Sequence, residues 1–237
     1  LRNGPLMRDS EFAANQMKIN IIEAGKNILP MFSQKLSSRA EKDLLKLGVM
    51  VKKDKVVKEI NSKEIKFKDG SFIASDITIW TAGVTGEPTY EKLKLPAERG
   101  RISVDGTLQV KNYPYIFAIG DISGARDKSG NFYPMVAPVA MQQGRFLAKQ
   151  LDKLSKGEKL ENFIYKDKGS MATIGRHKAI VEVKKFKFAG VLAWYAWLWL
   201  HLFYLLGGRN KLGTVADWTW NYLTFDRSNR HIIDLKE

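Results

Sequence analysis

The stretch FAIGD, residues 117–121, is the part of the sequence that decides the fold. Three apolar residues lead into Gly120, as they do at the end of a buried strand, and Asp121 follows directly. Glycine lets the backbone approach a bound group closely, and a carboxylate accepts hydrogen bonds from sugar hydroxyls. Because a Gly-Asp pair alone is more often a simple turn, the segments around it have to decide between a turn and a nucleotide site.

The segments on both sides of FAIGD carry regular patterns. Ile77–Trp80 and Tyr115–Ile119 are short apolar runs, which are typical of strands buried on both faces. After a polar loop, a helix is predicted from Ala137 to Leu154, and Gly157 is expected to end it. Its apolar face is expected to consist of Ala140, Leu147, Leu151 and Leu154.

The first third of the chain predicts one crossover unit of a parallel sheet. A β-branched strand over Lys18–Glu23 is followed by a helix with Ser33 as its N-cap and Gly48 just beyond its end, and a second strand covers Val49–Val51. Three short strands, 56–60, 65–67 and 71–74, should then form an antiparallel meander. Between the last two lies Asp69-Gly70, which favours a type I′ turn.

The composition and charge of the chain limit its possible functions. The 237 residues carry a formal net charge of +14, so an anionic membrane surface or nucleic acid is a candidate partner. The chain has no cysteine, which excludes disulfides, thiolate metal sites and thiol catalysis within it. No His, Asp or Glu cluster has the spacing of metal ligands, so we expect no metal. Residues 1–4, LRNG, show no signal or leader pattern.

The carboxy-terminal third is rich in aromatic residues. Phe188–Leu206 is a run of 19 residues with His201 as its only acidic or basic side chain, and basic residues flank both of its ends. As a helix it would reach roughly 28 Å, about the thickness of a hydrocarbon core. However, Trp194, Trp197 and Trp199 lie in its middle, whereas spanning helices keep tryptophan at the interfaces. We therefore expect helices over 186–225 that lie in one leaflet of a membrane with anionic lipid.

Several segments together resemble one family. FAIGD is similar to the second flavin-binding motif of two-dinucleotide-domain flavoproteins, and TIWTAGVTG (78–86) and VAPVAMQQG (136–144) resemble the segments before and after that motif. Residues 168–182 and 209–232 resemble the carboxy-terminal region of type II NADH dehydrogenases. The resemblance covers nearly the whole chain and implies two-electron transfer from NADH through FAD to a quinone without ion pumping.

The resemblance also implies a fold and a domain order. The expected fold is α/β, the carboxy-terminal part of a Rossmann-like FAD/NAD(P)-binding flavoprotein with an added membrane-anchoring helical region. Residues 1–83 would complete the NADH domain, 84–155 would close the FAD domain, and 156–237 would form the anchor and give access to quinone. The chain lacks the G-x-G-x-x-G fingerprint that opens each dinucleotide unit, so both are expected upstream of Leu1. A chain of this length alone is expected to bind FAD poorly and to be inactive.

The resemblance assigns residues to both cofactors. Gly120 and Asp121 would bind FAD, and the helix that starts near Ala137 and Val139 would direct its positive end at the flavin ring. For NADH, Glu23 would bind the adenosine ribose, and Ala82 and Gly83 would lie beside the nicotinamide. An acid at position 23 favours NADH over NADPH. Without the resemblance, these residues would read as a surface acid and a small-residue turn.

The quinone and membrane assignments also follow from the resemblance. The quinone pocket would include Pro138, where many relatives carry glutamine, and Gln142. For Gln142 and Gln143, a position on a solvated helix face is an alternative of equal weight to a place in the quinone pocket. His177 and His201 are considered as proton donors to quinone, although packed histidines are more common. The anchor would be formed by Trp194, Trp197, Trp199, Trp218 and Trp220. The expected enzyme is a homodimer on the inner face of a respiratory membrane, most simply the bacterial cytoplasmic membrane.

Other functions stay open at the level of sequence. A related flavoenzyme that reduces quinone with sulfide needs paired cysteines, which this chain lacks, and a disulfide reductase would have a soluble dimer interface in place of the aromatic tail. A basic membrane-surface or nucleic-acid-binding module is the alternative without catalysis. We expect no nucleic acid, because the tryptophans form a continuous apolar run and do not alternate with basic residues along a groove.

Overall fold

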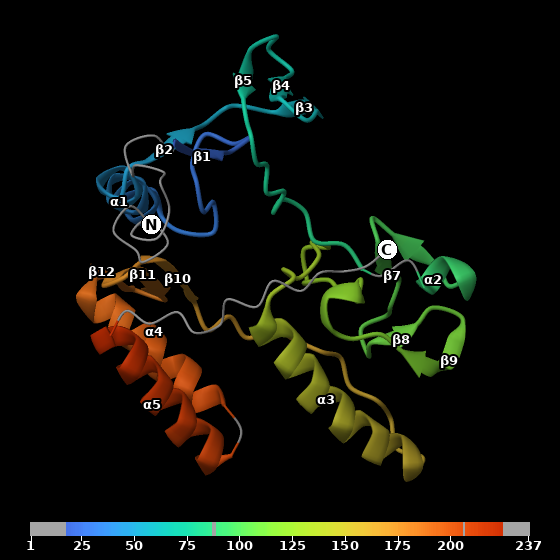
Figure 1. Ribbon diagram of the computed structural model, residues 1–237. Coiled ribbons are helices and arrows are strands. Elements are labelled where there is room, and N and C mark those ends of the chain that lie inside the picture. Colours follow the sequence, from blue (N-terminus) through green and yellow to red (C-terminus); the bar gives the residue numbers. More distant parts are fainter. Residues whose placement is uncertain (1–17, 87–88, 206, 225–237) are drawn as a thin grey trace, which may run out of the picture. The chain divides into compact units, whose positions relative to one another are not determined.

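The computed structural model describes residues 18–86, 89–205 and 207–224 (Figure 1). It divides into two compact units, one formed by residues up to Thr78 together with those from Gly169, and the other by Ile79–Lys168. Residues 1–4, where no leader pattern is expected, and the part of the resemblance over 225–232 lie outside the described residues.

The predicted crossover unit is confirmed in the first unit. β1 (Ile19–Ile22) and β2 (Val49–Lys52) pair in parallel, and α1 (Gln34–Lys46) connects them. Ser33 is the N-cap residue of α1, although its hydroxyl makes no capping hydrogen bond. Gly48 follows the helix with φ +78°, a conformation that costs glycine little, so the predicted glycine stop is also confirmed.

The predicted meander is confirmed, but its turn is of another type. β3 (Val57–Ile60), β4 (Glu64–Phe67) and β5 (Phe72–Ala74) form an antiparallel sheet. Gly70 has φ +85°, whereas Asp69 is not among the residues with positive φ, so this is not a type I′ turn. The Asp69 carboxylate instead accepts hydrogen bonds from the N–H of Ser71 at 2.9 Å and from Lys55 Nζ at 2.5 Å, which hold a wider loop.

A third sheet in this unit is covered by helices on both faces. It contains β10 (Ser170–Gly175), β11 (Lys178–Val183) and β12 (Phe186–Gly190), with β11 in the centre (Figure 1). Successive side chains of a strand point to opposite faces. Ile180 therefore packs with α1, whereas Ala179 and Val181 pack with Ala193 of the helix that follows β12.

The aromatic tail forms two helices after this sheet. α4 covers Val191–Tyr204 and α5 covers Gly208–Thr224, so the expected helices over 186–225 begin later than predicted. Residues 186–190 are a strand because they pair with β11, and this pairing satisfies their backbone groups before the helix can start. Among the described residues, no helix combines the length and the apolar character that a membrane crossing needs.

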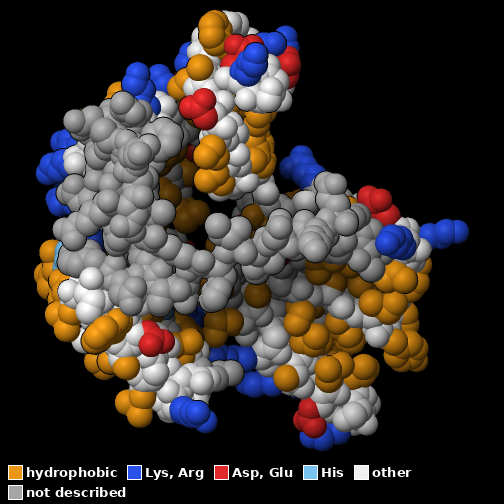
Figure 2. Space-filling model, viewed as in Figure 1, with side chains coloured by type: hydrophobic (Ala, Val, Ile, Leu, Met, Phe, Trp, Pro, Cys, Tyr) orange, Lys and Arg blue, Asp and Glu red, His pale blue; other side chains and the backbone are white. Residues whose placement is uncertain are grey.

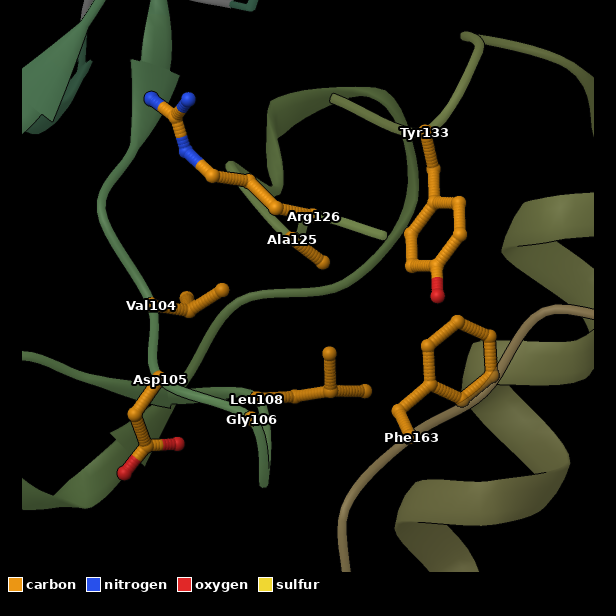
Figure 3. Close-up of a pocket in the computed structure, with 8 residues that line it drawn as sticks. All are labelled: Val104, Asp105, Gly106, Leu108, Ala125, Arg126, Tyr133 and Phe163. Atoms are coloured by element: carbon orange, nitrogen blue, oxygen red, sulfur yellow. The ribbon is translucent and has the colours of Figure 1, made fainter. Parts of the chain in front are cut away.

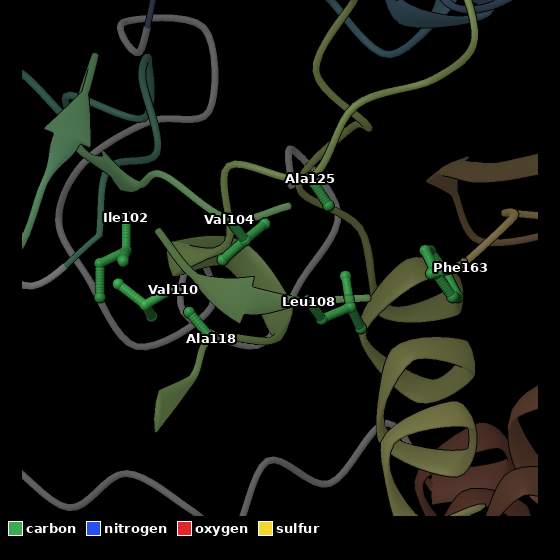
Figure 4. Close-up of a cluster of buried hydrophobic side chains, with 7 residues drawn as sticks. All are labelled: Ile102, Val104, Leu108, Val110, Ala118, Ala125 and Phe163. Carbon is green, nitrogen blue, oxygen red and sulfur yellow. The ribbon is translucent and has the colours of Figure 1, made fainter. Parts of the chain in front are cut away.

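The second unit is built from short strands, turns and one long helix. Its elements are α2 (Thr89–Lys92), β6 (Ala97–Glu98), β7 (Arg101–Ile102), β8 (Gln109–Val110), β9 (Tyr113–Phe117), the 3₁₀ turn η2 (Gly120–Ile122) and α3 (Ala137–Ser155). Its core brings β7, β8 and the segment after β9 together with Phe163 (Figure 4). Leu108, with no exposed surface, lies in this core.

Two predictions of burial in this region are wrong. Ile77 and Trp80, predicted in a buried strand, belong to no described strand and expose 82% and 61% of their surface. Among the described strands, β9 pairs only with β8, in an antiparallel ribbon, and Tyr115 exposes 87%. An apolar run predicts burial only if other strands cover it, and the described residues supply no parallel partner to either run.

The length of α3 is confirmed, but its buried face differs from the predicted one. Val139, Gln143 and Gln150 are its buried residues, whereas Leu151 and Leu154 are exposed. The helix turns its polar glutamines inward because each binds a backbone group of another segment. Apolar spacing alone therefore selected the wrong stripe. Gly157, with φ +70°, lies just beyond the end of α3, as predicted.

A carboxylate on the third sheet serves the N-terminus of α1. Glu182 of β11 accepts a hydrogen bond from the N–H of Ser33 at 2.7 Å, and Lys187 of β12 lies 2.6 Å from its other oxygen. The hydrogen bond from Lys187, followed by that from Ser33, lowers the pKa of Glu182 to about 2. A negative charge at a helix N-terminus is favourable, so this contact ties the crossover unit to the carboxy-terminal sheet.

Replacing Glu182 should give a pH-dependent loss of stability. A carboxylate whose pKa in the folded state is below the ordinary value of 4.5 stabilises the fold above that pH and loses its effect as the pH falls toward about 2. Glu182→Gln should therefore lower the urea midpoint at pH 7, and the difference from the wild type should shrink on acidification. Tryptophan fluorescence reports the unfolding of this unit through α4 and α5.

Glu59→Gln is the matched control for this measurement. Glu59 makes an exposed ion pair with Lys66 in the same unit, at 3.5 Å, and the midpoint should hardly change. Equal shifts for the two variants, or a Glu182→Gln effect that persists at low pH, would contradict the capping role.

Candidate functional site

The end of the segment 78–86 lies against the turn at Gly120. A Cβ on Gly86 would stand 2.6 Å from the carbonyl oxygen of Gly100 and 2.8 Å from Cγ1 of Ile122, closer than any real side chain is found. The N–H of Gly86 donates to the same Gly100 oxygen at 3.1 Å. The absence of a side chain at Gly86 therefore brings the first of the three quoted segments beside the second.

The Gly-Asp pair itself forms a tight turn with an exposed acid. Gly120 has φ +75° and begins η2, and the N–H of Ser123 donates to its carbonyl at 3.0 Å. The Asp121 side chain is exposed, and no hydrogen bond to it is found among the described residues. Arg101 lies within electrostatic reach, since partial burial lowers the pKa of its guanidinium and the charge of Asp121 opposes that change.

The third segment supplies a helix start next to this turn. α3 begins at Ala137 after the extended residue Val136, which provides no side-chain cap, and Pro138 in the first turn has no N–H to satisfy. Ala137 is exposed and Val139 is buried. From the second turn of α3, Oε1 of Gln143 accepts the N–H of Gly120 at 2.7 Å. The three segments thus meet at the turn Gly120–Ile122.

Gln142 is held by a different part of the chain. Its amide nitrogen donates to the carbonyl of Lys166 at 3.0 Å, and its oxygen accepts the N–H of Lys166 at 3.0 Å. Both ends of the amide therefore fix the segment after α3. The quinone pocket that the sequence places at Pro138 and Gln142 stays a prediction.

The residues expected to bind NADH are found in irregular backbone. Glu23 follows β1, and one of its carboxylate oxygens accepts the N–H of Gly25 at 2.7 Å. No hydrogen bond to the second oxygen is found in the described part of the chain. A contact to a ribose would require an oxygen that is not already bonded in this way. Ala82 and Gly83 are exposed, and Gly83 has φ +85°. Their role toward the cofactor stays a prediction.

A small cavity lies in the same unit (Figure 3). Its volume is about 120 Å³, below the roughly 300–1,000 Å³ of typical ligand pockets. It is lined by Val104, Asp105, Gly106, Leu108, Ala125, Arg126, Tyr133 and Phe163, which include none of the residues predicted to bind a cofactor. We therefore regard it as a packing gap in the core.

The five predicted anchor tryptophans have two kinds of environment. Trp199 and Trp220 are 72% and 60% exposed. Trp194 packs on the rings of His177 and Tyr222, and Trp197 stacks on His201 with 3.7 Å between ring centroids. Trp218 is half-buried. Both histidines are therefore packed against aromatic rings, which is the more common of the two roles considered for them.

Known proteins match the chain across this site and in the carboxy-terminal region. Residues 10–144, more than half of the chain, match the family described as pyridine nucleotide-disulphide oxidoreductase, and residues 168–227 match the NDH2 C-terminal domain. The type II NADH:quinone oxidoreductase Ndh of Mycobacterium tuberculosis is 32% identical over 93% of this chain and 49% of its own length. The chain belongs to the type II NADH dehydrogenases, within the pyridine nucleotide-disulphide oxidoreductase family.

Further relatives agree with this family. A type II NADH:quinone oxidoreductase of Staphylococcus aureus is 34% identical over 70% of the chain and 42% of its own length. The structure of NDH2 from Plasmodium falciparum in complex with NADH matches with a TM-score of 0.83 over 94% of this chain and 62% of that one. At 18% identity the latter shows the α/β fold alone. The chain spans about half the length of the curated relatives it matches.

Two residues of this site have no recognisable sequence signal. Gly86 is one residue of the segment 78–86, and its close contact with Gly100 and Ile122 has no local signal, because the three positions are separated along the chain. Arg101 carried no motif at all. For Gln143 the residue was noted, but a solvated face was an open alternative, and the structure shows it 1% exposed.

Gly86→Ala and Gly144→Ala should have opposite effects on stability. The new methyl group at position 86 would meet backbone and should destabilise the protein by roughly 1–3 kcal/mol, as overpacking does. Gly144 lies within α3 with open space around it, so alanine there should stabilise by about 0.5–1 kcal/mol. Urea unfolding of both variants measures the two changes. A neutral Gly86→Ala would show that 78–86 does not pack against the turn.

Proposed function

We propose that this chain is the carboxy-terminal part of an enzyme that passes electrons from NADH through FAD to a quinone without ion pumping. The observation that carries the proposal is that three separate segments meet at the turn Gly120–Ile122, which contains the exposed acid Asp121. The names of the relatives support NADH and quinone as the two substrates. FAD, when bound, would supply the two-electron relay between them.

The residues around Gly120 fit a flavin nucleotide. The glycine leaves room for a close approach, and a Cβ there would have only Ala140 within 4 Å, at 3.8 Å. Asp121 offers a carboxylate to sugar hydroxyls. The uncapped start of α3 offers a positive helix end, which favours a ring that gains negative charge on reduction. In the other unit, Glu23 would accept hydrogen bonds from the adenosine ribose of NADH and so favour it over NADPH.

Asp121→Ala should lose FAD. Hydrogen bonds to a charged group contribute about 1.5–3 kcal/mol, so the affinity of the intact protein for FAD should fall roughly 10- to 100-fold. Titration of flavin-free protein with FAD, together with the yellow absorbance of the purified protein, measures this change. Asp152→Ala is the control, because Asp152 lies on the surface of α3 and pairs with Lys156 at 2.8 Å. Full flavin content in Asp121→Ala would reduce Gly120-Asp121 to a turn.

The second part of the proposal places the protein on a membrane surface with anionic lipid. Leu192, Trp199 and Phe203 expose 75%, 72% and 69% of their surface and share one side of α4, since they are seven and four residues apart. α5 likewise exposes Leu212, Trp220 and Leu223. Figure 2 shows such hydrophobic side chains open to solvent. The net charge of +14 suits an anionic surface, such as the inner face of a bacterial cytoplasmic membrane. A homodimer is part of the same proposal.

Removing three apolar side chains from α4 should weaken membrane binding. In the triple variant Leu192→Ser, Trp199→Ser and Phe203→Ser, each substitution removes about 1–2 kcal/mol of apolar transfer. Partition onto vesicles that contain anionic lipid should therefore fall by roughly 10²- to 10⁴-fold. Sedimentation of the protein with such vesicles measures the effect, while the flavin content should not change.

A matched triple variant in the other unit serves as the control. Leu93, Leu151 and Ile164 are 61%, 47% and 57% exposed, and their replacement by serine should leave partition within about twofold of the wild type. Equal losses in both triple variants would contradict a specific anchor. Labelling of Lys185→Cys and Lys211→Cys from opposite sides of a sealed vesicle would contradict a position in one leaflet.

A further inference from the structure

The three glutamines of α3 all bind backbone groups from other segments. Gln142 binds both polar atoms of the Lys166 backbone, Gln143 accepts the N–H of Gly120, and Gln150 accepts the N–H of Glu161. Gln143 and Gln150 are each 1% exposed, and both hydrogen bonds measure 2.7 Å. They lie seven residues apart and so face the same side of the helix. The two differ only in the segment they hold.

The burial of Gln143 needs a reason. An amide that leaves water without a hydrogen bond costs free energy, and methionine would fill nearly the same volume without that cost. The compensation is the N–H of Gly120, which begins a 3₁₀ turn whose preceding residue, Ile119, offers no side-chain cap. Gln143 therefore supplies from α3 the acceptor that the turn lacks locally.

This hydrogen bond fixes the peptide group just before Asp121. Gly120 has φ +75° and few steric limits of its own, so its N–H direction is set by the acceptor that it meets. The N–H of Ser123 then closes the turn on the carbonyl of Gly120. The backbone of this turn sets the direction in which the Asp121 side chain leaves it. One side chain thus links the position of the carboxylate to the helix whose first turn begins at Ala137.

We propose that Gln143 is a positioning residue for the flavin, which acts through the N–H of Gly120 and sets the direction of the Asp121 carboxylate. The inference rests on the proposed binding of FAD at Gly120-Asp121. It assigns to Gln143 a role distinct from that of Gln142, whose amide holds Lys166, and from a contact with quinone. Gln143 itself touches no reacting atom in this role.

The test compares Gln143→Met with Gln150→Met in the intact flavoprotein. Both remove one buried acceptor from one backbone N–H on the same helix face, so their urea midpoints without FAD should fall by similar amounts. Fluorescence titration with FAD should separate them. We expect the dissociation constant for FAD to rise about tenfold in Gln143→Met and to stay within about twofold of the wild type in Gln150→Met. Equal changes in FAD affinity would overturn the proposal.

A double-mutant cycle with Asp121→Ala tests the route of the effect. If Gln143 acts through Asp121, the double variant should bind FAD no more than about twofold weaker than Asp121→Ala alone. Full additivity of the two losses would overturn the proposal. Gln143→Glu keeps the acceptor oxygen and should restore most of the FAD affinity lost in Gln143→Met. A Glu variant as weak as the Met variant would assign the effect to packing and also overturn it.

The same series separates failure of the inference from failure of the proposed function. Asp121→Ala with unchanged FAD affinity would refute the flavin site itself, and the inference with it. Loss of FAD in Asp121→Ala with unchanged affinity in Gln143→Met would refute only the positioning role. A Gln143→Met protein that does not fold, beside a folded Gln150→Met, would assign a structural role to Gln143 and overturn the proposal.

Discussion

Buried backbone N–H groups must find acceptors, and the irregular segments of this protein take theirs from side chains far away in the sequence. Gln143 serves Gly120, Gln150 serves Glu161, and Glu182 serves Ser33 at a separation of 149 residues. These contacts do what continuous sheets do in more regular proteins, since the strands described here are short and fall into five small sheets. The placement of the turn at Gly120 and of α1 depends on them.

The secondary structure could be predicted where its signals are local. The crossover unit over residues 18–51, the meander and α3 follow from periodicity, caps and glycines, which act within a few residues. Burial could not be predicted in the same way. The apolar runs at Ile77–Trp80 and Tyr115–Ile119 predict buried strands. Burial depends on which strands lie beside them, and the described residues provide no such neighbours. Likewise, α3 buries glutamines because of their partners on other segments.

In the candidate site, too, local patterns could be predicted, whereas contacts between distant segments could not. Gly120, Asp121 and the helix start at Ala137 were found because each belongs to a segment with a recognisable pattern. The contacts that bring the segments together could not be predicted. The missing Cβ of Gly86 and the amide of Gln143 act on residues far away along the chain, and spacing rules relate only residues that are close in sequence. A family resemblance identifies the parts of such a site, whereas the contacts between them require the fold.

The tail illustrates how one helix can require two apolar environments. β11 covers one side of α4, where Ala193 has no exposed surface, and this small side chain lets the helix lie close to the sheet. The other side carries Leu192, Trp199 and Phe203, which are largely exposed. A helix that is apolar all round is stable only where both sides are shielded from water. The protein supplies one shield within the described structure, and the hydrocarbon boundary of a membrane is the second shield that we propose, because it meets an exposed aromatic stripe without requiring the helix to cross the bilayer.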